Sequence, residues 1–146
     1  MSDTRVTALE HSIQQTNIWL KKLADEQDLG DRHHAYNALR AVLHVLRDRL
    51  TPEQAVHLGA QLPIVVRGVF YEGWRIYGTP TRERTVDDFV AQVDGYLPPQ
   101  FPLDAKSVTR AVFDLLWTEL DPGEVAKIVE SLPIPLRNLW PSIAHH

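Results

Sequence analysis

The chain has 146 residues, of which 44% are hydrophobic, and no cysteine, so it fits one domain with a core and excludes disulfides, thiolate zinc sites and a cysteine nucleophile. Its net charge of −4 gives no general attraction to nucleic acid or to an anionic membrane, which makes nucleic-acid binding unlikely. Residues 1–5 lack the apolar run of a secretory signal, and no stretch is apolar enough for a membrane helix, so we expect a cytoplasmic protein without membrane insertion.

The first distinctive segment is DEQDLGDRHH, residues 25–34, which combines four acidic side chains with two histidines. A calcium loop of the EF-hand type needs oxygen donors at alternate positions and a closing glutamate, but a leucine and a tyrosine stand at two of these positions. His33 and His34 are adjacent, so on a helix they point in different directions. We predict no metal site here, and expect Gly30 to end one helix and Asp31 to cap the next.

The segment AYNALRAVLHVLRDRL, residues 35–50, has the periodicity of an amphipathic helix. Its apolar side chains recur at spacings of 3, 4, 3 and 4 and form one stripe: Tyr36, Leu39, Leu43, Leu46 and Leu50. Thr51, Pro52 and Gln54 then have the spacing of a capping box with proline at the first helical position, which predicts a short helix. That helix should end before Pro63, which begins another.

The same pattern recurs 70 residues later, where LPIVVRGVF at 62–70 is matched by LPIPLRNLW at 132–140. Residues 35–70 and 105–140 align without a gap and have 11 identities in 36 positions. We interpret the chain as a tandem duplication of a unit of about four helices, with repeats at about 7–76 and 77–146. The prediction is a single compact all-α bundle over residues 1–146, in which the two units pack face to face about a pseudo-twofold axis.

The segment YGTPTRERT, residues 77–85, joins the two repeats. Its glycine and proline should end the preceding helix, while Thr85 and Asp88 have the spacing of an N-cap for the next. Trp19, Leu20 and Leu23 align with three apolar residues of that next helix: Phe89, Val90 and Val93.

Two stretches carry a resemblance to a known family: ALRAVLHVLRDRLTPEQAVHLGAQLPIVVRGVFYEGW and VTRAVFDLLWTELDPGEVAKIVESLPIPLRNLWP. Together they resemble the bacterial domain of unknown function 2267 family, over roughly residues 9–142. The resemblance implies an all-helical, intracellular protein. The family has no established activity, so the resemblance leaves function open.

The polar residues that both repeats keep are four arginines, paired at the 70-residue offset: Arg40 with Arg110, and Arg67 with Arg137. An arginine beside an apolar stripe can bury its stem and bond the carbonyl end of a neighbouring helix. Alternatively, arginines related by a pseudo-twofold axis could bind a phosphate or carboxylate from both sides. The sequence leaves both roles open.

The main difference between the repeats is FYEGWRIYG, which continues the first repeat beyond the position where the second reaches a proline. On one continuous helix, Arg67, Tyr71 and Trp74 would follow one another on the same face. Arginine, tyrosine and tryptophan are enriched in interface hot spots, so these three form our candidate interaction surface, with the adjoining RIYGTP segment. The alternative is that this longer helix packs on the helix that contains Phe89.

No catalytic motif is present: His44 and His57 are isolated on predicted helices, and Asp87 and Asp88 are best placed at a helix N-terminus. We predict no catalytic residue, metal or cofactor. The most favoured function is a non-catalytic interaction or regulatory module with a protein partner or a second copy of itself. The alternative is a small-molecule or anion-binding protein, or an enzyme, that uses the arginines between the repeats.

Overall fold

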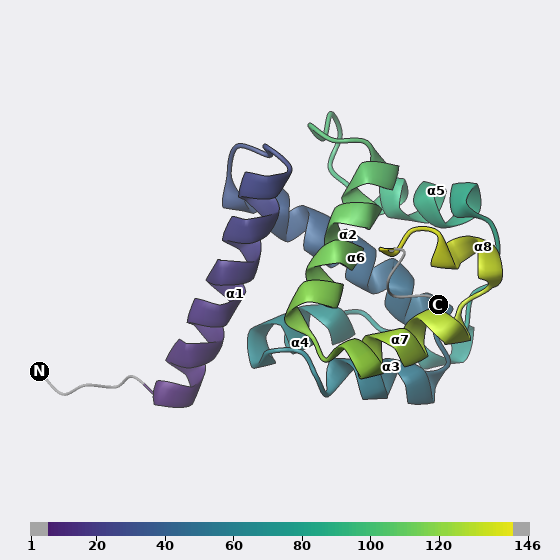
Figure 1. Cartoon of the computed structure of the whole chain (residues 1–146), viewed down its shortest axis with the longest axis horizontal. Helices are drawn as coiled ribbons and strands as arrows, with labels where there is room; N and C mark the ends of the chain where they lie inside the picture. The colour runs from purple at the N-terminus through teal and green to yellow at the C-terminus, as the bar shows by residue number, and fades with distance from the viewer. Residues whose placement is uncertain (1–5, 142–146) are drawn as a thin grey trace, which may run out of the picture.

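The computed structural model describes residues 6–141, and this part of the chain is entirely helical, without a strand (Figure 1). The last five residues of the predicted second repeat lie outside the described residues. The elements, in chain order, are α1 Thr7–Glu26, α2 Arg32–Arg49, α3 Pro52–Gly59, α4 Ile64–Tyr71, the 3-10 turn η1 Ile76–Gly78, α5 Val86–Tyr96, α6 Ala105–Glu119, α7 Pro122–Ser131 and α8 Ile134–Arg137. The all-α prediction is therefore confirmed.

Side-chain caps begin several of these helices at the predicted positions. Thr51 Oγ1 accepts from the backbone N–H of Gln54 at 3.2 Å, and the Gln54 side chain accepts from the backbone N–H of Thr51 at 3.0 Å, which completes a capping box. Helices α2, α5 and α7 each begin with a single cap bond, in which the side chain of Asp31, Thr85 or Asp121 accepts from the backbone N–H three residues later. Because these bonds are local, sequence spacing alone was enough to place the helix starts.

Two local expectations were wrong. Gly30 does adopt a positive φ of +87°, but α1 already ends at Glu26, so the glycine shapes the loop before α2 rather than ending α1. Tyr36 remains 38% exposed, although the periodicity placed it on the buried stripe of α2. In the first turns of α2 the buried residues are Ala35, Ala38 and Leu39, so the face that packs on the core is turned away from Tyr36.

The helix bounds of the second half follow those of the first at the 70-residue offset. Helices α3 and α7 begin at Pro52 and Pro122, and α4 and α8 begin at Ile64 and Ile134. The equivalent helices differ most in length at two places: α1 extends nine residues further toward the N-terminus than α5 at this offset, and α8 is half as long as α4; smaller differences separate α2 from α6 and α3 from α7. The pseudo-twofold arrangement itself stays a prediction.

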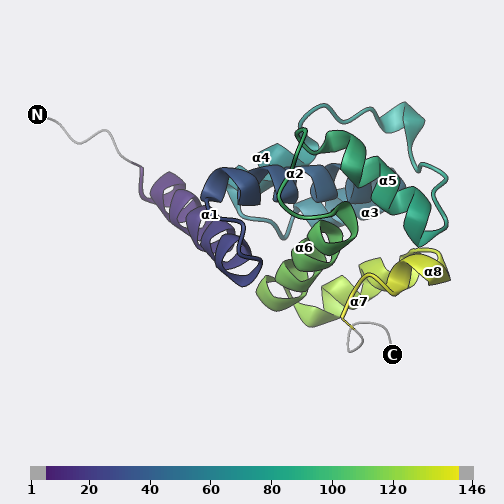
Figure 2. The ribbon, with the colours of Figure 1, turned by 90° about the horizontal axis from the view of Figure 1, so that it is seen from above.

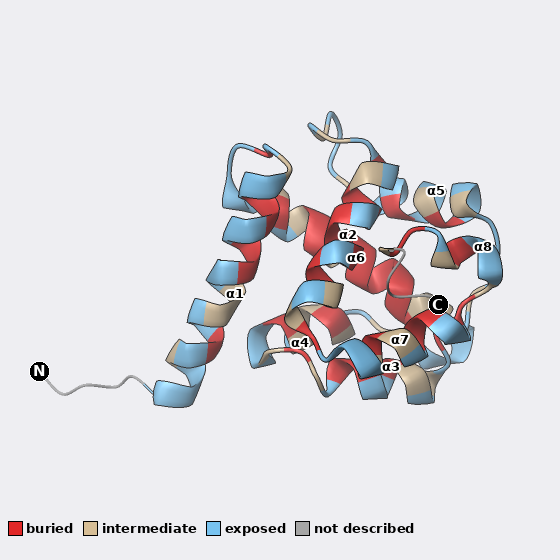
Figure 3. Cartoon of the chain, viewed as in Figure 1, coloured by how far each residue is buried: buried red, intermediate tan, exposed pale blue. Residues whose placement is uncertain are grey.

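Helices α2 and α6 cross at the centre of the molecule, whereas α1 and α8 lie toward opposite ends (Figure 2). Helix α2 packs against α1, α4, α5 and α6, and α3 packs against α7. The buried apolar residues form one cluster to which both halves contribute (Figure 3). Phe113 lies within it, tilted against Phe89 at 5.9 Å and stacked on Trp140 at 3.9 Å between ring centroids.

None of the helices in residues 6–141 combines the length and the apolar character needed to cross a bilayer. In the same part of the chain, no group of three or more His, Asp or Glu side chains is placed to hold a metal ion.

Candidate functional site: the connector and its cleft

Arg67 and Arg137 bond the backbone at equivalent places in the two halves. Arg67 donates to carbonyl oxygens at the end of α3 and just beyond it: Gly59 at 2.8 Å, Ala60 at 3.2 Å and Leu62 at 3.0 Å. Arg137 donates to those at the end of α7: Glu130 at 2.8 Å and Leu132 at 3.1 Å. These carbonyls lack partners within their own helices, so both arginines act as C-terminal caps. Anion binding by this pair stays a prediction.

The other arginine pair has unequal surroundings. Arg40 Nε donates to Glu72 Oε1 at 2.7 Å. Arg110 is exposed and lines a depression of about 250 Å³ with Asp114 and Trp140. A cleft of about 400 Å³ does lie at the seam between α3 and α7, but none of the four paired arginines is among its described lining residues.

Tyr71 and Trp74 are half-buried and pack on each other. Helix α4 ends at Tyr71, and the chain turns at Gly73 with a φ of +70°, so Trp74 does not continue the helical face as we had expected. Their rings stack at 5.4 Å between centroids, with an angle of 26°. Tyr71 also lies against Gly59, where an added Cβ would overlap the tyrosine hydroxyl.

Interaction through Arg67, Tyr71 and Trp74 stays a prediction, but their contacts within the chain are now defined. Helix α4 packs chiefly against α1, α2 and α3 rather than against α5, the helix of Phe89. Arg67 uses its guanidinium on the carbonyls after α3, Tyr71 covers Gly59, and Trp74 covers Tyr71. The three candidate residues therefore contribute mainly to packing within the first half. The exposed residues of the predicted surface lie in the adjoining segment, chiefly at 75–78.

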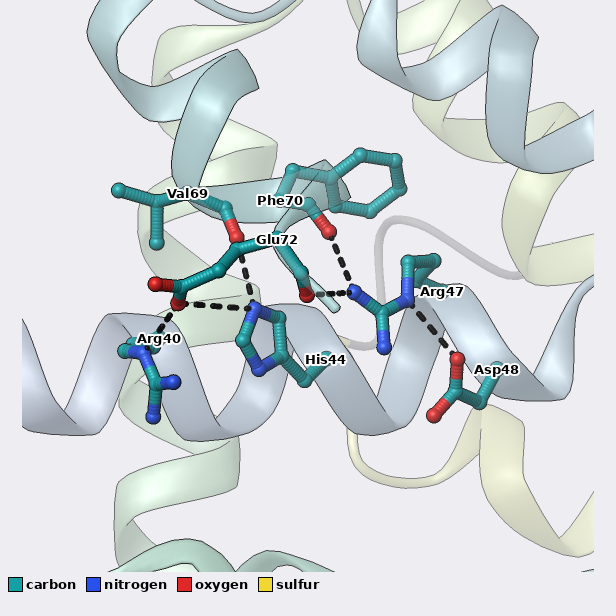
Figure 4. A network of polar contacts seen from close by, with 7 residues as sticks. All are labelled: Arg40, His44, Arg47, Asp48, Val69, Phe70 and Glu72. Carbon is teal, nitrogen blue, oxygen red and sulfur yellow. Dashed lines mark hydrogen bonds and ion pairs between the residues drawn. The ribbon is translucent and has the colours of Figure 1, made fainter. Parts of the chain in front are cut away.

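The end of α4 is held by a row of polar side chains on α2 (Figure 4). His44 Nε2 lies 2.7 Å from the carbonyl oxygen of Val69, to which it donates in the neutral tautomer that carries the proton on Nε2. Arg47 Nη1 donates to the carbonyl oxygens of Phe70 at 2.9 Å and Glu72 at 2.7 Å. Both α2 side chains are about 3% exposed, so these bonds replace water for buried groups.

Electrostatics around this network follow from burial and from one ion pair. Burial lowers the pKa of His44, because the charged imidazolium is disfavoured away from water; the bond to Val69 opposes this, and Arg47 and Arg40 add repulsion. The hydrogen bond and the positive charge of Arg40 hold the pKa of Glu72 below its usual value. At neutral pH the network therefore contains a neutral histidine and a charged glutamate.

Our sequence reasoning did not find this network. Its sequence signal is the spacing of 4 and 3 that puts Arg40, His44 and Arg47 on one face of α2. At the 70-residue offset, the second half has Asp114 and Trp117 in place of the last two. A comparison of the two copies residue by residue would have shown that only the first half carries this basic row.

Residues 72–85, between α4 and α5, are called the connector from here on. Two hydrogen bonds fix it to the end of α2: Thr81 N–H donates to the Asp48 carbonyl at 2.8 Å, and Arg49 Nε donates to the Glu83 carbonyl at 2.7 Å. The turn η1 holds Ile76, which is 48% exposed, and Tyr77, which is fully exposed. The connector therefore presents apolar side chains to solvent from an anchored backbone.

A cleft of about 370 Å³, the connector cleft, opens between the connector, α2 and α5. Its wall includes two glycines and the polar side chains Arg47, Asp48, Arg75, Thr79, Thr81 and Tyr96. Arg47 uses Nε on Asp48 at 2.8 Å and Nη1 on two carbonyls, whereas Nη2 has no bond to residues 6–141 (Figure 4).

The connector is also rich in uncompensated positive charge. Arg75, Arg82 and Arg84 are exposed, and none of them has a hydrogen-bond or ion-pair partner within the described part of the chain. The connector has two acidic side chains against these three arginines: Glu83 and Glu72, and Glu72 is already paired with Arg40 of α2. The connector is thus basic on a protein whose net charge is −4.

A family model described as "Uncharacterized conserved protein (DUF2267)" matches residues 16–139. No protein of the curated set matches the chain. The matched range contains all of the connector and every side chain of the connector cleft.

Proposed function

The chain belongs to the domain of unknown function 2267 family, whose description names no activity, and we propose that it is a non-catalytic cytoplasmic interaction module that binds an acidic protein segment through its connector. The observation that carries the proposal is the exposure of Ile76 and Tyr77 on an anchored backbone.

An exposed tyrosine on an anchored turn suits protein recognition for a physical reason. Tyrosine provides a large, amphipathic contact with few rotatable bonds, so binding restricts little side-chain freedom. The backbone after the turn is held to α2 by the bonds at Thr81 and Glu83, and the backbone before it by the bond from Arg47 to the Glu72 carbonyl, which reduces the entropy lost on binding. No packing within residues 6–141 accounts for the fully exposed ring of Tyr77.

The charge of the connector selects the kind of partner. Arg75, Arg82 and Arg84 have no partner in the described chain and attract acidic groups. A nucleic acid is a less suitable partner, because Asp87 and Asp88 follow directly in the first turn of α5 and interrupt the positive surface. We therefore assign an acidic protein segment with an apolar residue for Tyr77 to contact.

The proposal includes the origin of the connector. We infer that the chain is one domain, 1–146, built by tandem duplication of two units about a pseudo-twofold axis. The common helix starts and the equivalent caps made by Arg67 and Arg137 support this inference. At the 70-residue offset, residues 77–85 of the connector correspond to residues 7–15, which form the first turns of α1, so the two halves differ in structure here. A function that a symmetric bundle would lack can be placed at such a difference.

The test uses native mass spectrometry and cross-linking on the gently purified protein. A double variant, Ile76→Ala with Tyr77→Ala, removes the exposed apolar surface, and a matched variant, Ile134→Ala with Tyr36→Ala, removes exposed side chains elsewhere. The proposal expects a stoichiometric protein partner on the wild type and the matched variant, cross-linked through an acidic segment and lost from the connector variant. A partner retained by the connector variant, or a bound nucleic acid instead, would refute it.

A further inference from the structure

We infer that the connector cleft is a binding site for a single anionic group, a carboxylate or a phosphate, held between Arg47 and Arg75. The inference goes beyond the proposed function, because it concerns the chemistry of the cleft and holds whether the anion belongs to a protein segment or to a small molecule. It rests on the cleft, on the burial of Arg47 and on the donors around it.

Arg47 is the first part of the argument. Its side chain is 4% exposed, and burying a guanidinium is costly unless its N–H groups are bonded. Asp48 and two carbonyls bind Nε and Nη1, which leaves both hydrogens of Nη2 without a bond to the described residues. The second half places Trp117 at the equivalent position, so packing at this position does not require an arginine.

The rest of the wall supplies further donors and few acceptors. Arg75 is exposed and has no partner in the described chain. The hydroxyls of Thr81 and Tyr96 also make no hydrogen bond to any described residue. The one carboxylate of the wall, Asp48, is already paired with Arg47. A wall with two arginines, free hydroxyls and one neutralised carboxylate favours a ligand that accepts hydrogen bonds and carries negative charge.

The size and rigidity of the cleft fit such a group. Its volume of about 370 Å³ is at the lower end of the range for ligand sites, which is enough for an anionic group and a small attached portion. The bond from Thr81 N–H to Asp48 fixes one side, and the bonds of Arg47 fix the guanidinium before a ligand arrives. A preformed donor set of this kind loses little entropy on binding.

The test is a two-dimensional amide NMR titration of the full chain with inorganic phosphate and, separately, acetate, at an ionic strength kept constant with sodium chloride. Saturable shifts are expected at the wall amides of Gly73, Gly78 and Thr81. Arg75→Gln should weaken the affinity about tenfold, which corresponds to 1.4 kcal/mol. Arg32→Gln, the matched control at another exposed arginine without a partner in the described chain, should keep the wild-type affinity.

Several results of these titrations would overturn the anion site. Shifts that chloride reproduces, or an affinity that Arg75→Gln leaves unchanged, would overturn the inference. Arg47→Lys, checked for folding by circular dichroism, gives a second readout: because lysine has its three donors on one nitrogen and lacks the second terminal nitrogen of the guanidinium fork, it cannot hold both carbonyls and also reach the anion as Nη2 does, so phosphate affinity must fall. An unchanged affinity in a folded Arg47→Lys protein would also overturn the inference.

A third titrant, a short acidic peptide with an amidated C-terminus, separates this inference from the proposed function. Phosphate binding in the cleft without peptide binding would support the inference, assign a small-molecule anion and count against the protein partner. Peptide binding that shifts the amides of Ile76 and Tyr77 but leaves the cleft amides unmoved would support the proposed function and overturn the anion site.

Discussion

Arg137 caps the end of α7 in the same register in which Arg67 caps the end of α3, exactly 70 residues earlier. In each case the guanidinium reaches back to the carbonyls of the corner that precedes its own helix. The arginine and the Leu-Pro corner, Leu62–Pro63 or Leu132–Pro133, therefore form one structural unit. Proline ends the hydrogen-bonding pattern of the first helix, and arginine bonds carbonyls that have no helical N–H partner there.

Replacement of these arginines should measure their capping role. We expect Arg67→Ala to reduce the free energy of unfolding by about 1–3 kcal/mol, since three carbonyls lose a charged donor, and Arg137→Ala to reduce it by less, since two do. Urea denaturation followed by circular dichroism gives both values. Arg32→Ala is the control and should change stability by no more than about 0.5 kcal/mol. An Arg67→Ala protein as stable as this control would contradict the capping role.

The contact between Gly59 and Tyr71 predicts a steric effect that depends on both residues. Gly59→Ala should destabilise the protein by about 1–3 kcal/mol, because the new methyl group would overlap the tyrosine ring. In a Tyr71→Ala background, where the ring is absent, Gly59→Ala should no longer cause this loss of stability. Gly68→Ala is the matched control: it lies in α4 with open space around the added methyl group, and should stabilise the protein by about 0.5–1 kcal/mol. Equal effects of Gly59→Ala in both backgrounds would refute the overlap.

His44 predicts a dependence of stability on pH. Its pKa is lower in the folded protein than in the unfolded chain, so the unfolded chain binds a proton first as pH falls. The contribution of neutral His44 is complete above the unfolded pKa of about 6.5 and is lost as pH falls from there through the lower folded pKa. Urea denaturation at pH 7.5 and 5.5 should show lower stability at pH 5.5.

The comparison that isolates His44 uses two glutamine variants. His44→Gln should have a smaller loss of stability between pH 7.5 and 5.5 than the wild type, whereas His57→Gln, at an exposed histidine, should keep the wild-type loss. Glu72, whose pKa is also lowered, contributes in a separate range, because its stabilisation is lost only as pH falls below about 4.5. The same pH dependence in His44→Gln as in the wild type would show that other groups cause it.

Two arginines on one face of α2 should differ greatly in their effect on stability. Arg47→Ala should cost roughly 3 kcal/mol or more, because it leaves the buried Phe70 carbonyl, the Glu72 carbonyl and the Asp48 carboxylate without their donor. Arg40→Ala should have only a small effect, since its ion pair with Glu72 is solvent-exposed. Thermal or urea unfolding checks the order. An Arg40→Ala protein as unstable as Arg47→Ala would contradict it.

Local rules explain why the sequence was sufficient for most helix boundaries. The caps at Thr51 and Asp121 involve residues three positions apart, and the apolar periods of α2 and α6 follow from helix geometry. The end of α4 was not predictable in this way, because the periodicity continued through Trp74 while Gly73 turned the chain. The periodicity describes a helix that could form, and tertiary contacts decide where it stops.

The candidate site was harder to predict because its contacts are distant in sequence. His44 appeared isolated and Arg47 drew no attention as a site residue, because their partners lie 25 and 23 residues further along the chain, at Val69 and Phe70. The repeated arginines were visible, and the capping role was one of the two alternatives considered for them. The connector cleft depends on residues from α2, the connector and α5, a combination that no single motif indicates.

The contacts of α2 also have a consequence for cutting the chain. Helix α2 packs on α5 and α6, α1 packs on α6, and Lys22 pairs with Glu119, so each half completes its core with the other. The connector crosses from one half to the other at the surface around Tyr77. A chain nicked there should stay assembled as two complementing fragments, whereas either fragment alone would expose its apolar face and fail to fold.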